Sequence, residues 1–142
     1  MKQRFHYAGI ALLVVFAHVA YGQDVRREIP FPDFSGYETL VGDLHTHTVF
    51  SDGDVWPPVR VEEAWRQGLD VISITDHVEY QRGKEDVPTN PNRPYELAVE
   101  TAQAHKVLLI RGAEITRDTP PGHFNAIFLR DVNPLDTPEF LD

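Results

Sequence analysis

The stretch that decides the fold reads Asp43-Leu-His-Thr-His-Thr-Val-Phe-Ser-Asp-Gly53. Alternate residues of a β-strand point to the same face, so a strand here would place the side chains of His45 and His47 side by side. Asp52 follows closely, and the three residues together offer nitrogen and oxygen ligands for a divalent metal ion. The alternative is a pair of surface histidines beside a turn, because Ser-Asp-Gly is also a common turn sequence.

The surrounding hydrophobic pattern predicts strands that alternate with helices. Pro57-Pro58 suits the first turn of a helix, and Gly68 is a plausible stop at its end. The β-branched run 71–75 is typical of a strand buried on both faces. The predicted elements are strand 39–47, helix 57–67, strand 71–75, helix 95–105, strand 106–115 and strand 123–129.

The order of these elements predicts an α/β fold with parallel strands and right-handed crossovers. The connection between the strand that ends at Ile115 and the strand that begins at His123 is too short for such a crossover, so a hairpin is expected there. In open α/β sheets and in barrels the functional site lies at the carboxyl ends of the parallel strands.

Further candidate ligands stand at those strand ends. His77 and Glu114 end the second and third strands, and the hairpin would bring His123 beside Glu114, although His123 could instead simply cap a turn. Two metal ions or more are expected, with Glu114 or Asp52 able to bridge them, because a closed zinc site needs only four ligands. The predicted metal ligands are His45, His47, Asp52, His77, Glu114 and His123.

Paired metal ions suit phosphoester hydrolysis, in which a metal-bound hydroxide is the nucleophile and no Ser or Cys nucleophile is required. Asp76 either orients one of the imidazoles or caps the end of its strand. Arg111 and Arg117 are candidates for binding a phosphate, because arginine forms bidentate hydrogen bonds with it. The loop 79–94 is either a lid over the site or an ordinary solvated connection.

The N-terminus has the pattern of an export signal. Lys2 and Arg4 precede an apolar run over residues 8–17, and Ala20-Tyr21-Gly22 fits a cleavage site. We therefore expect residues 1–22 to be a signal peptide, 23–38 an extended lead-in and 39–142 the hydrolase domain, with export to the periplasm or beyond. A buried first helix is the alternative reading of the apolar run, which is too short to span a bilayer.

The composition of the chain indicates which classes of binding partner to expect. There is no cysteine, which excludes disulfides and thiolate metal sites, and the net charge is −9. A nucleic-acid duplex is not expected as a partner, because such binding depends on Lys and Arg. A small phosphorylated substrate remains possible because bound metal ions can invert the charge of a pocket. No stable membrane insertion is expected after signal cleavage, and the sequence leaves the oligomeric state open.

Four motifs resemble those of the polymerase and histidinol phosphatase (PHP) domain family. They are Asp43-Leu-His-Thr-His-Thr with Ser51-Asp-Gly53, Ile74-Thr-Asp-His77, Gly112-Ala-Glu114 and Gly122-His-Phe-Asn125. The resemblance implies a distorted (β/α)7 barrel, phosphoester hydrolysis and two or three ions of zinc, manganese or iron. It gives metal-ligand roles to the same six residues.

The later motifs of that family, a histidine or cysteine and a terminal Asp-x-His pair, have no match here. The expectation is therefore the N-terminal part of a barrel that is apparently truncated. Two other functions stay open: an amidohydrolase-like metal hydrolase, which also begins with His-x-His, and a non-catalytic metal-binding module of a larger exported protein.

Overall fold

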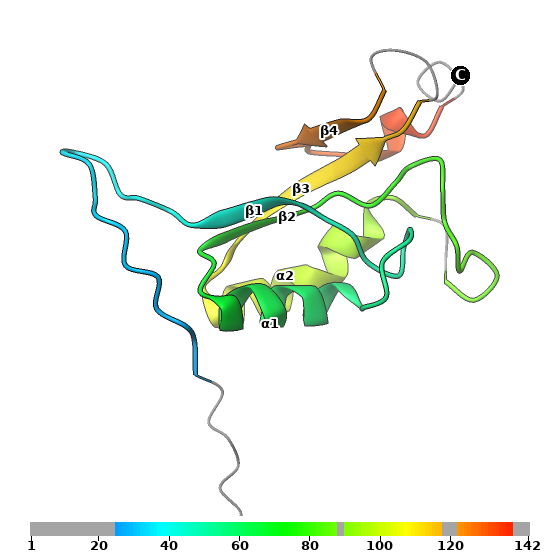
Figure 1. Cartoon of the computed structure of the whole chain (residues 1–142). Helices are drawn as coiled ribbons and strands as arrows, with labels where there is room; N and C mark the ends of the chain where they lie inside the picture. The colour runs from blue at the N-terminus through cyan, green and yellow to red at the C-terminus, as the bar shows by residue number, and fades with distance from the viewer. Residues whose placement is uncertain (1–24, 88–89, 118–121, 138–142) are drawn as a thin grey trace, which may run out of the picture.

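The computed structural model describes residues 25–87, 90–117 and 122–137. The four strands form one sheet in the order β1-β2-β3-β4, and both helices cover the same face of it (Figure 1). The predicted signal peptide lies outside the described residues. The elements are β1 (Gly42–Thr46), α1 (Pro57–Gln67), β2 (Val71–Ile74), α2 (Arg93–His105), β3 (Leu108–Ile115), β4 (Phe124–Ile127) and the short 3₁₀ helix η1 (Asn133–Leu135).

Helix α1 begins and ends where its sequence predicts. Proline occupies the first turn, where a missing N–H costs nothing. Gly68 closes the helix in the left-handed conformation with φ of 89°, and its N–H reaches the carbonyls of Ala64 and Trp65. A Cβ at Gly68 would also lie 2.4 Å from the carbonyl oxygen of Arg27, so the lead-in passes too close for any other residue.

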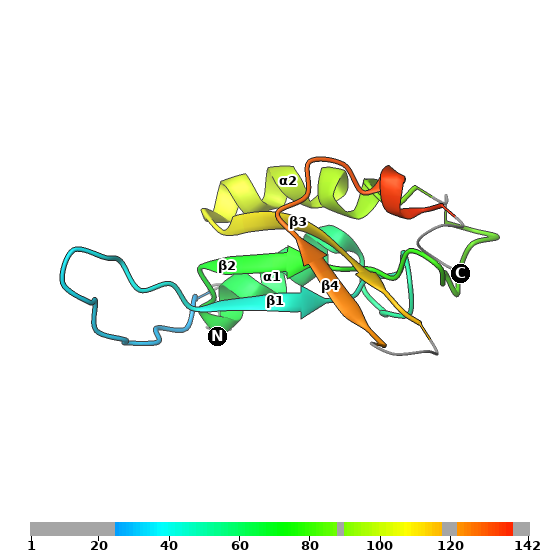
Figure 2. The same cartoon turned by 90° about the horizontal axis from the view of Figure 1, so that it is seen from above.

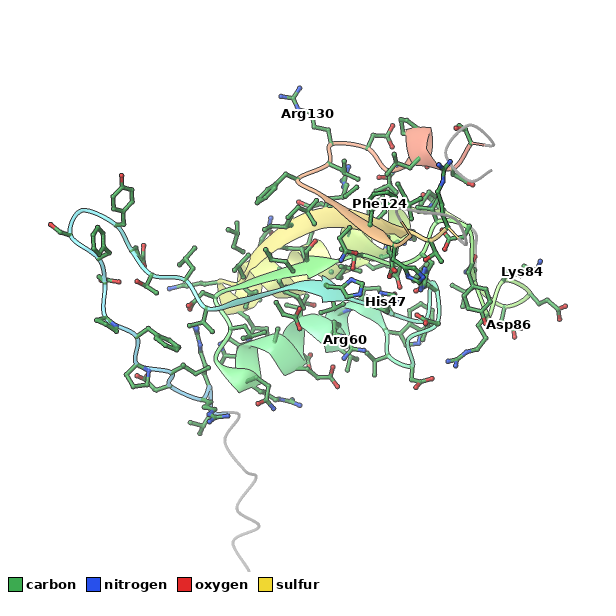
Figure 3. The ribbon with its side chains drawn as sticks, turned by 45° about the horizontal axis from the view of Figure 1, so that its top comes forward. His47, Arg60, Lys84, Asp86, Phe124 and Arg130 are labelled. Carbon is green, nitrogen blue, oxygen red and sulfur yellow. The ribbon has the colours of Figure 1, made fainter. Side chains whose placement is uncertain are left out.

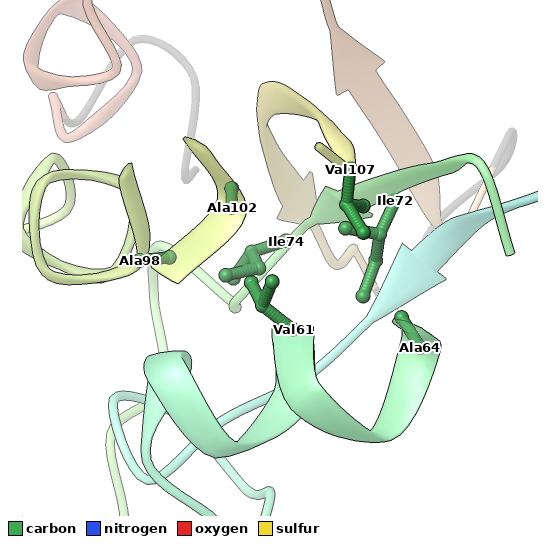
Figure 4. Packing of buried hydrophobic residues seen from close by; sticks show 7 residues of the cluster. All are labelled: Val61, Ala64, Ile72, Ile74, Ala98, Ala102 and Val107. Carbon is green, nitrogen blue, oxygen red and sulfur yellow. The ribbon is translucent and has the colours of Figure 1, made fainter. Parts of the chain in front are cut away.

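Strand β2 is buried along its whole length, as its β-branched sequence predicts. Its isoleucines pack against small and branched side chains of both helices, which lets helix and sheet approach closely (Figure 4). Burying its valine and isoleucine side chains contributes about 1.5–3 kcal/mol each, so this layer stabilises the fold. The buried cluster comprises Val61, Ala64, Ile72, Ile74, Ala98, Ala102 and Val107.

The strand pairing confirms both the parallel sheet and the hairpin. β1 pairs with β2 and β2 with β3 in parallel, whereas β3 and β4 are antiparallel. β4 runs back alongside the second half of β3 (Figure 2). Gly112 permits the crowding between these strands, because a Cβ there would lie 2.8 Å from Ser73 Oγ and 2.9 Å from the carbonyl oxygen of Ala126. The result is a mixed α/β fold whose sheet curls like part of a TIM-like barrel, as expected.

Several predicted boundaries need correction. α2 begins at Arg93 rather than residue 95, because Pro94 stands in its first turn. β3 begins at Leu108, since Lys106 adopts a left-handed conformation (φ 57°) that closes α2. β1 and β4 are shorter than expected at both ends, and Phe128 leaves β4 with φ of 62°. Among the described residues, none belongs to a helix long and apolar enough to cross a lipid bilayer.

Candidate metal centre

The six predicted ligands come together at one end of the sheet. His45 lies in β1 and His47 directly follows it, while Glu114 stands near the end of β3. His77 forms an isolated parallel bridge with Glu114, which fixes the backbone of the two residues side by side. Figure 3 shows His47 among the side chains gathered at this end, whereas Arg130 projects away from them.

Glu114 is the centre of the cluster and is only 4% exposed. Its Oε2 lies 2.9 Å from His47 Nε2 and 3.6 Å from Nε2 of both His45 and His77. Its Oε1 lies 2.7 Å from His123 Nδ1. One carboxylate therefore faces four imidazoles from three separate segments of the chain.

Asp52 forms the second side of the cluster. Its Oδ1 lies 2.5 Å from His47 Nδ1, and its Oδ2 lies 3.7 Å from His77 Nε2. Two groups consequently have ligand atoms within 4.8 Å of one another, namely His45, His47 and Glu114, and His47, Asp52 and His77. His47 belongs to both, so the described residues offer two adjoining positions for metal ions.

The donor set fits metal ions better than a set of ordinary hydrogen bonds. His47 Nε2 is buried and makes no hydrogen bond, although Glu114 Oε2 is only 2.9 Å away. A buried polar atom without a partner costs about 1–3 kcal/mol, so it needs an explanation. A cation held jointly by the imidazole nitrogen and the carboxylate would supply the missing partner.

The histidines also act on the two acids. Burial by itself would raise the pKa of Glu114, but the hydrogen bond with His123 and the charges of His77, His45 and His47 outweigh it and lower the pKa. Burial likewise opposes the shift at Asp52, where the hydrogen bond with His47 and the charges of His47 and His77 lower the pKa. Both carboxylates are therefore held in the ionised form that a metal ion requires.

The comparisons with known proteins agree with this geometry. The PHP domain model matches residues 43–134, which include all six ligands and most of the chain. The chain belongs to the PHP domain family. In a search of solved structures it is similar to a two-domain protein of Bacteroides vulgatus that contains a predicted PHP-like metal-dependent phosphoesterase. The identity is 55%, the TM-score is 0.79, and the match covers 82% of this chain.

A curated relative is an uncharacterized protein of Methanocaldococcus jannaschii, 35% identical over 80 residues that make up 55% of this chain. The match covers 34% of each of these two proteins. This chain thus spans about a third of the length of these two proteins.

Asp76 of this PHP domain bonds the turn that follows β1, and its role in orienting an imidazole stays a prediction. It is 8% exposed and accepts hydrogen bonds from Thr48 N, Thr48 Oγ1 and Ser51 Oγ, each at 2.6 Å. Asp76 thereby fixes the turn between His47 and Asp52. The same turn needs Gly53, where a Cβ would lie 2.6 Å from the backbone of His47 and Thr48.

Arg111, which the sequence predicts to bind a phosphate, lies away from Glu114, and its phosphate-binding role stays a prediction. Leu109, two residues earlier in β3, packs against the helix-side core, so Arg111 shares that face and Glu114 takes the opposite one. The Arg111 guanidinium lies 4.3 Å from the centre of the Tyr95 ring on α2 and also bonds the carbonyl oxygen of Arg130. Arg117 is half-buried three residues beyond Glu114, and its phosphate-binding role stays a prediction.

Sequence reasoning missed three residues that contact the ligands. Thr75 Oγ1 lies 2.9 Å from His45 Nδ1, and Glu79 Oε1 lies 3.1 Å from His77 Nδ1. Thr116 Oγ1 lies 3.0 Å from His77 Nδ1 and 3.3 Å from His123 Nδ1. Each of the three is two residues from a predicted ligand in the sequence. A threonine or glutamate in such a position is too common to predict a contact from the sequence alone.

The described part of the loop 79–94 packs beside the metal centre. Arg82 N donates to the carbonyl of Ser51, and the Arg82 side chain bonds both the carbonyl of Gly53 and the carboxylate of Asp54. The loop therefore braces the turn that carries Asp52. A role as a lid stays a prediction.

Proposed function

We propose that the protein is a metal-dependent phosphoesterase that hydrolyses a small phosphorylated substrate. The observation that carries the proposal is the cluster of four imidazoles around Glu114, with Asp52 on a second side. Membership of the PHP family and the likeness to the Bacteroides vulgatus protein support it. Because this chain spans about a third of that protein, the activity is proposed for the whole protein.

The proposed cofactors are two or three divalent ions of zinc, manganese or iron. His45, His47 and Glu114 would hold one ion. The group His47, Asp52 and His77 would hold a second. His123 would complete the set on the Oε1 side of Glu114. Such ions, when bound, supply Lewis acidity and an activated water for attack on phosphorus. The mixed imidazole and carboxylate set accepts all three metals.

The charges of the site suit an anionic substrate once ions are bound. Asp52 and Glu114 carry two negative charges between them, and their lowered pKa values keep these charges at neutral pH. Two divalent ions would carry four positive charges, so the loaded site would be positive overall. The acidic character of the chain is therefore no obstacle to binding a phosphate.

We also propose that the protein is exported to the periplasm or beyond. The basic start, the apolar run and the small-x-small site within residues 1–22 support this proposal. Mass spectrometry of the protein purified from an exporting host tests it. A mature chain that begins near Gln23 is expected, and a chain that keeps Met1 would contradict it.

The central experiment combines metal analysis with substrate classes. The protein is loaded with Zn²⁺, Mn²⁺ or Fe²⁺ and assayed with phosphate monoesters, phosphate diesters and amides. We expect phosphoester turnover that falls by orders of magnitude in His47→Ala, because His47 belongs to both candidate metal positions. His105→Ala is the matched control, since His105 lies at the end of α2 with its ring 4.6 Å from that of Trp65.

The other outcomes are equally informative. Turnover of amides alone would favour an amidohydrolase-like enzyme. Tight metal binding without turnover of any substrate would favour a non-catalytic metal-binding module. Either result would overturn the phosphoesterase proposal.

A further inference from the structure

The two ring nitrogens of His77 face different surroundings. Nε2 points into the metal centre, 3.6 Å from Glu114 Oε2 and 3.7 Å from Asp52 Oδ2. Nδ1 lies 3.1 Å from Glu79 Oε1 and 3.0 Å from Thr116 Oγ1. The His77 side chain is 12% exposed, and Glu79 reaches its Nδ1 from the exposed side.

The identity of Glu79 determines which nitrogen of His77 carries the proton. An ionised carboxylate can only accept a hydrogen bond, so the nitrogen that faces it must donate. A lone pair on Nδ1 would instead face a negative oxygen at 3.1 Å, which is repulsive. A neutral imidazole has one N–H, and a proton on Nδ1 therefore leaves the lone pair on Nε2.

Thr116 cannot make this choice by itself. Its hydroxyl can either donate to Nδ1 or accept from it, because a hydroxyl does both. In the second arrangement the hydroxyl hydrogen is free to point to Glu114 Oε1, which is 3.4 Å away. Without Glu79, Thr116 could donate to Nδ1 and so stabilise the tautomer whose proton blocks Nε2.

We propose that Glu79 is a positioning residue that holds His77 in the Nδ1–H tautomer and so presents the Nε2 lone pair to the metal centre. Glu79 contacts Nδ1 of His77, whereas Nε2 of the same ring faces Glu114 and Asp52. Partners of this kind on metal-binding histidines typically change metal affinity by about 10–100-fold. The inference rests on the metal site of the proposed function, and it requires nothing about the substrate.

The first test measures affinity for Zn²⁺ and Mn²⁺ by competition with a chromophoric chelator. We expect Glu79→Ala to bind about 10–100-fold more weakly than the wild type, and Glu79→Gln, which keeps an acceptor oxygen, to recover part of the loss. Glu85→Ala is the matched control, because it removes the same charge from an exposed position of the same loop. Wild-type affinity in Glu79→Ala would overturn the inference.

The second test reads the tautomer directly in the metal-free protein. Two-bond ¹⁵N–¹H correlation spectra, recorded where the imidazole is neutral, distinguish Nδ1–H from Nε2–H. We expect the Nδ1–H pattern for His77 in the wild type and in Thr116→Val, and a shift toward Nε2–H in Glu79→Ala. A wild-type His77 in the Nε2–H form would overturn the inference.

The two proposals fail in different ways. An affinity loss and a tautomer change in a protein that hydrolyses no phosphoester would support the role of Glu79 and overturn the proposed function. Phosphoester hydrolysis with unchanged affinity and tautomer in Glu79→Ala would do the reverse. Circular dichroism of each variant confirms that it is folded.

Discussion

Asp76 and Thr48 are joined by two hydrogen bonds, from the backbone N and from Oγ1 of Thr48, each 2.6 Å long. Thr48 is fully buried and Asp76 nearly so, which shields both bonds from water. Through this pair, the end of β2 determines the course of the chain between His47 and Asp52. The spacing of two candidate metal ligands, His47 and Asp52, thus depends on a carboxylate outside the candidate ligand groups.

Replacing Asp76 with asparagine is expected to destabilise the fold by about 2 kcal/mol or more, because hydrogen bonds to a charged acceptor contribute roughly 1.5–3 kcal/mol. The amide also offers only one acceptor oxygen in place of the two carboxylate oxygens that accept from Thr48 and Ser51. Denaturant titration of the metal-free protein measures the change. Asp54→Asn is the control, since the Asp54 side chain is 85% exposed. Equal stability of the two variants would show that the buried hydrogen bonds of Asp76 do not stabilise the fold.

Gly112→Ala is expected to destabilise the sheet. The new Cβ would lie under 3.0 Å from Ser73 Oγ, Thr75 Cγ2 and the carbonyl oxygen of Ala126. Overpacking of this kind costs about 1–3 kcal/mol. Thermal or denaturant unfolding measures the cost. Gly83→Ala is the control, because its nearest contact would be 3.7 Å, and a cost as large as that of Gly112→Ala would show that crowding is not the cause.

Removing divalent ions with a chelator is expected to lower the unfolding temperature. A ligand that binds only the folded state stabilises it by about 2.7 kcal/mol when present at 100 times its dissociation constant. The effect should vanish in Glu114→Gln, because Glu114 faces four imidazoles and the amide lacks the negative charge. Scanning calorimetry with and without Zn²⁺ measures it. An unfolding temperature that does not respond to metal would contradict the candidate metal centre.

Acid should weaken the attachment of the lead-in through Asp70. The backbone N–H of Val41, and then the Arg26 side chain, lower the pKa of Asp70. A carboxyl group whose pKa is lower in the folded state stabilises the fold at pH values above its ordinary pKa, and this contribution disappears as the pH falls through the folded pKa.

Denaturant titrations of the wild type and Asp70→Asn over a series of pH values test this sign. The stability difference should be constant from neutral pH down to the ordinary pKa of aspartate, about 3.9, and should shrink below it. Asp33→Asn provides the comparison, because Asp33 accepts a hydrogen bond from Thr39 N in an exposed setting. A difference that grows on acidification would contradict the expected sign.

The residue pattern by itself determined the order of the elements, the parallel sheet, the hairpin and the six side chains that meet at its end. Local chemistry explains this success: proline and glycine mark the ends of α1, β-branched residues form β2, and the predicted ligands other than Asp52 lie at or near strand ends. Exact boundaries were less predictable. Lys106 takes a left-handed conformation that its residue type does not favour.

Only the tertiary structure decided the roles of Asp76, Arg111 and Glu79. Asp76 and His77 are neighbours in sequence, yet Asp76 bonds a turn from another segment. Arg111 lies three residues from Glu114 but faces the helices, because strand residues alternate between the two faces of a sheet. Glu79 is only two residues from His77, but its loop has no repeating pattern from which the direction of its side chain could be predicted. Contacts between distant segments depend on packing in three dimensions, which a linear pattern encodes only indirectly.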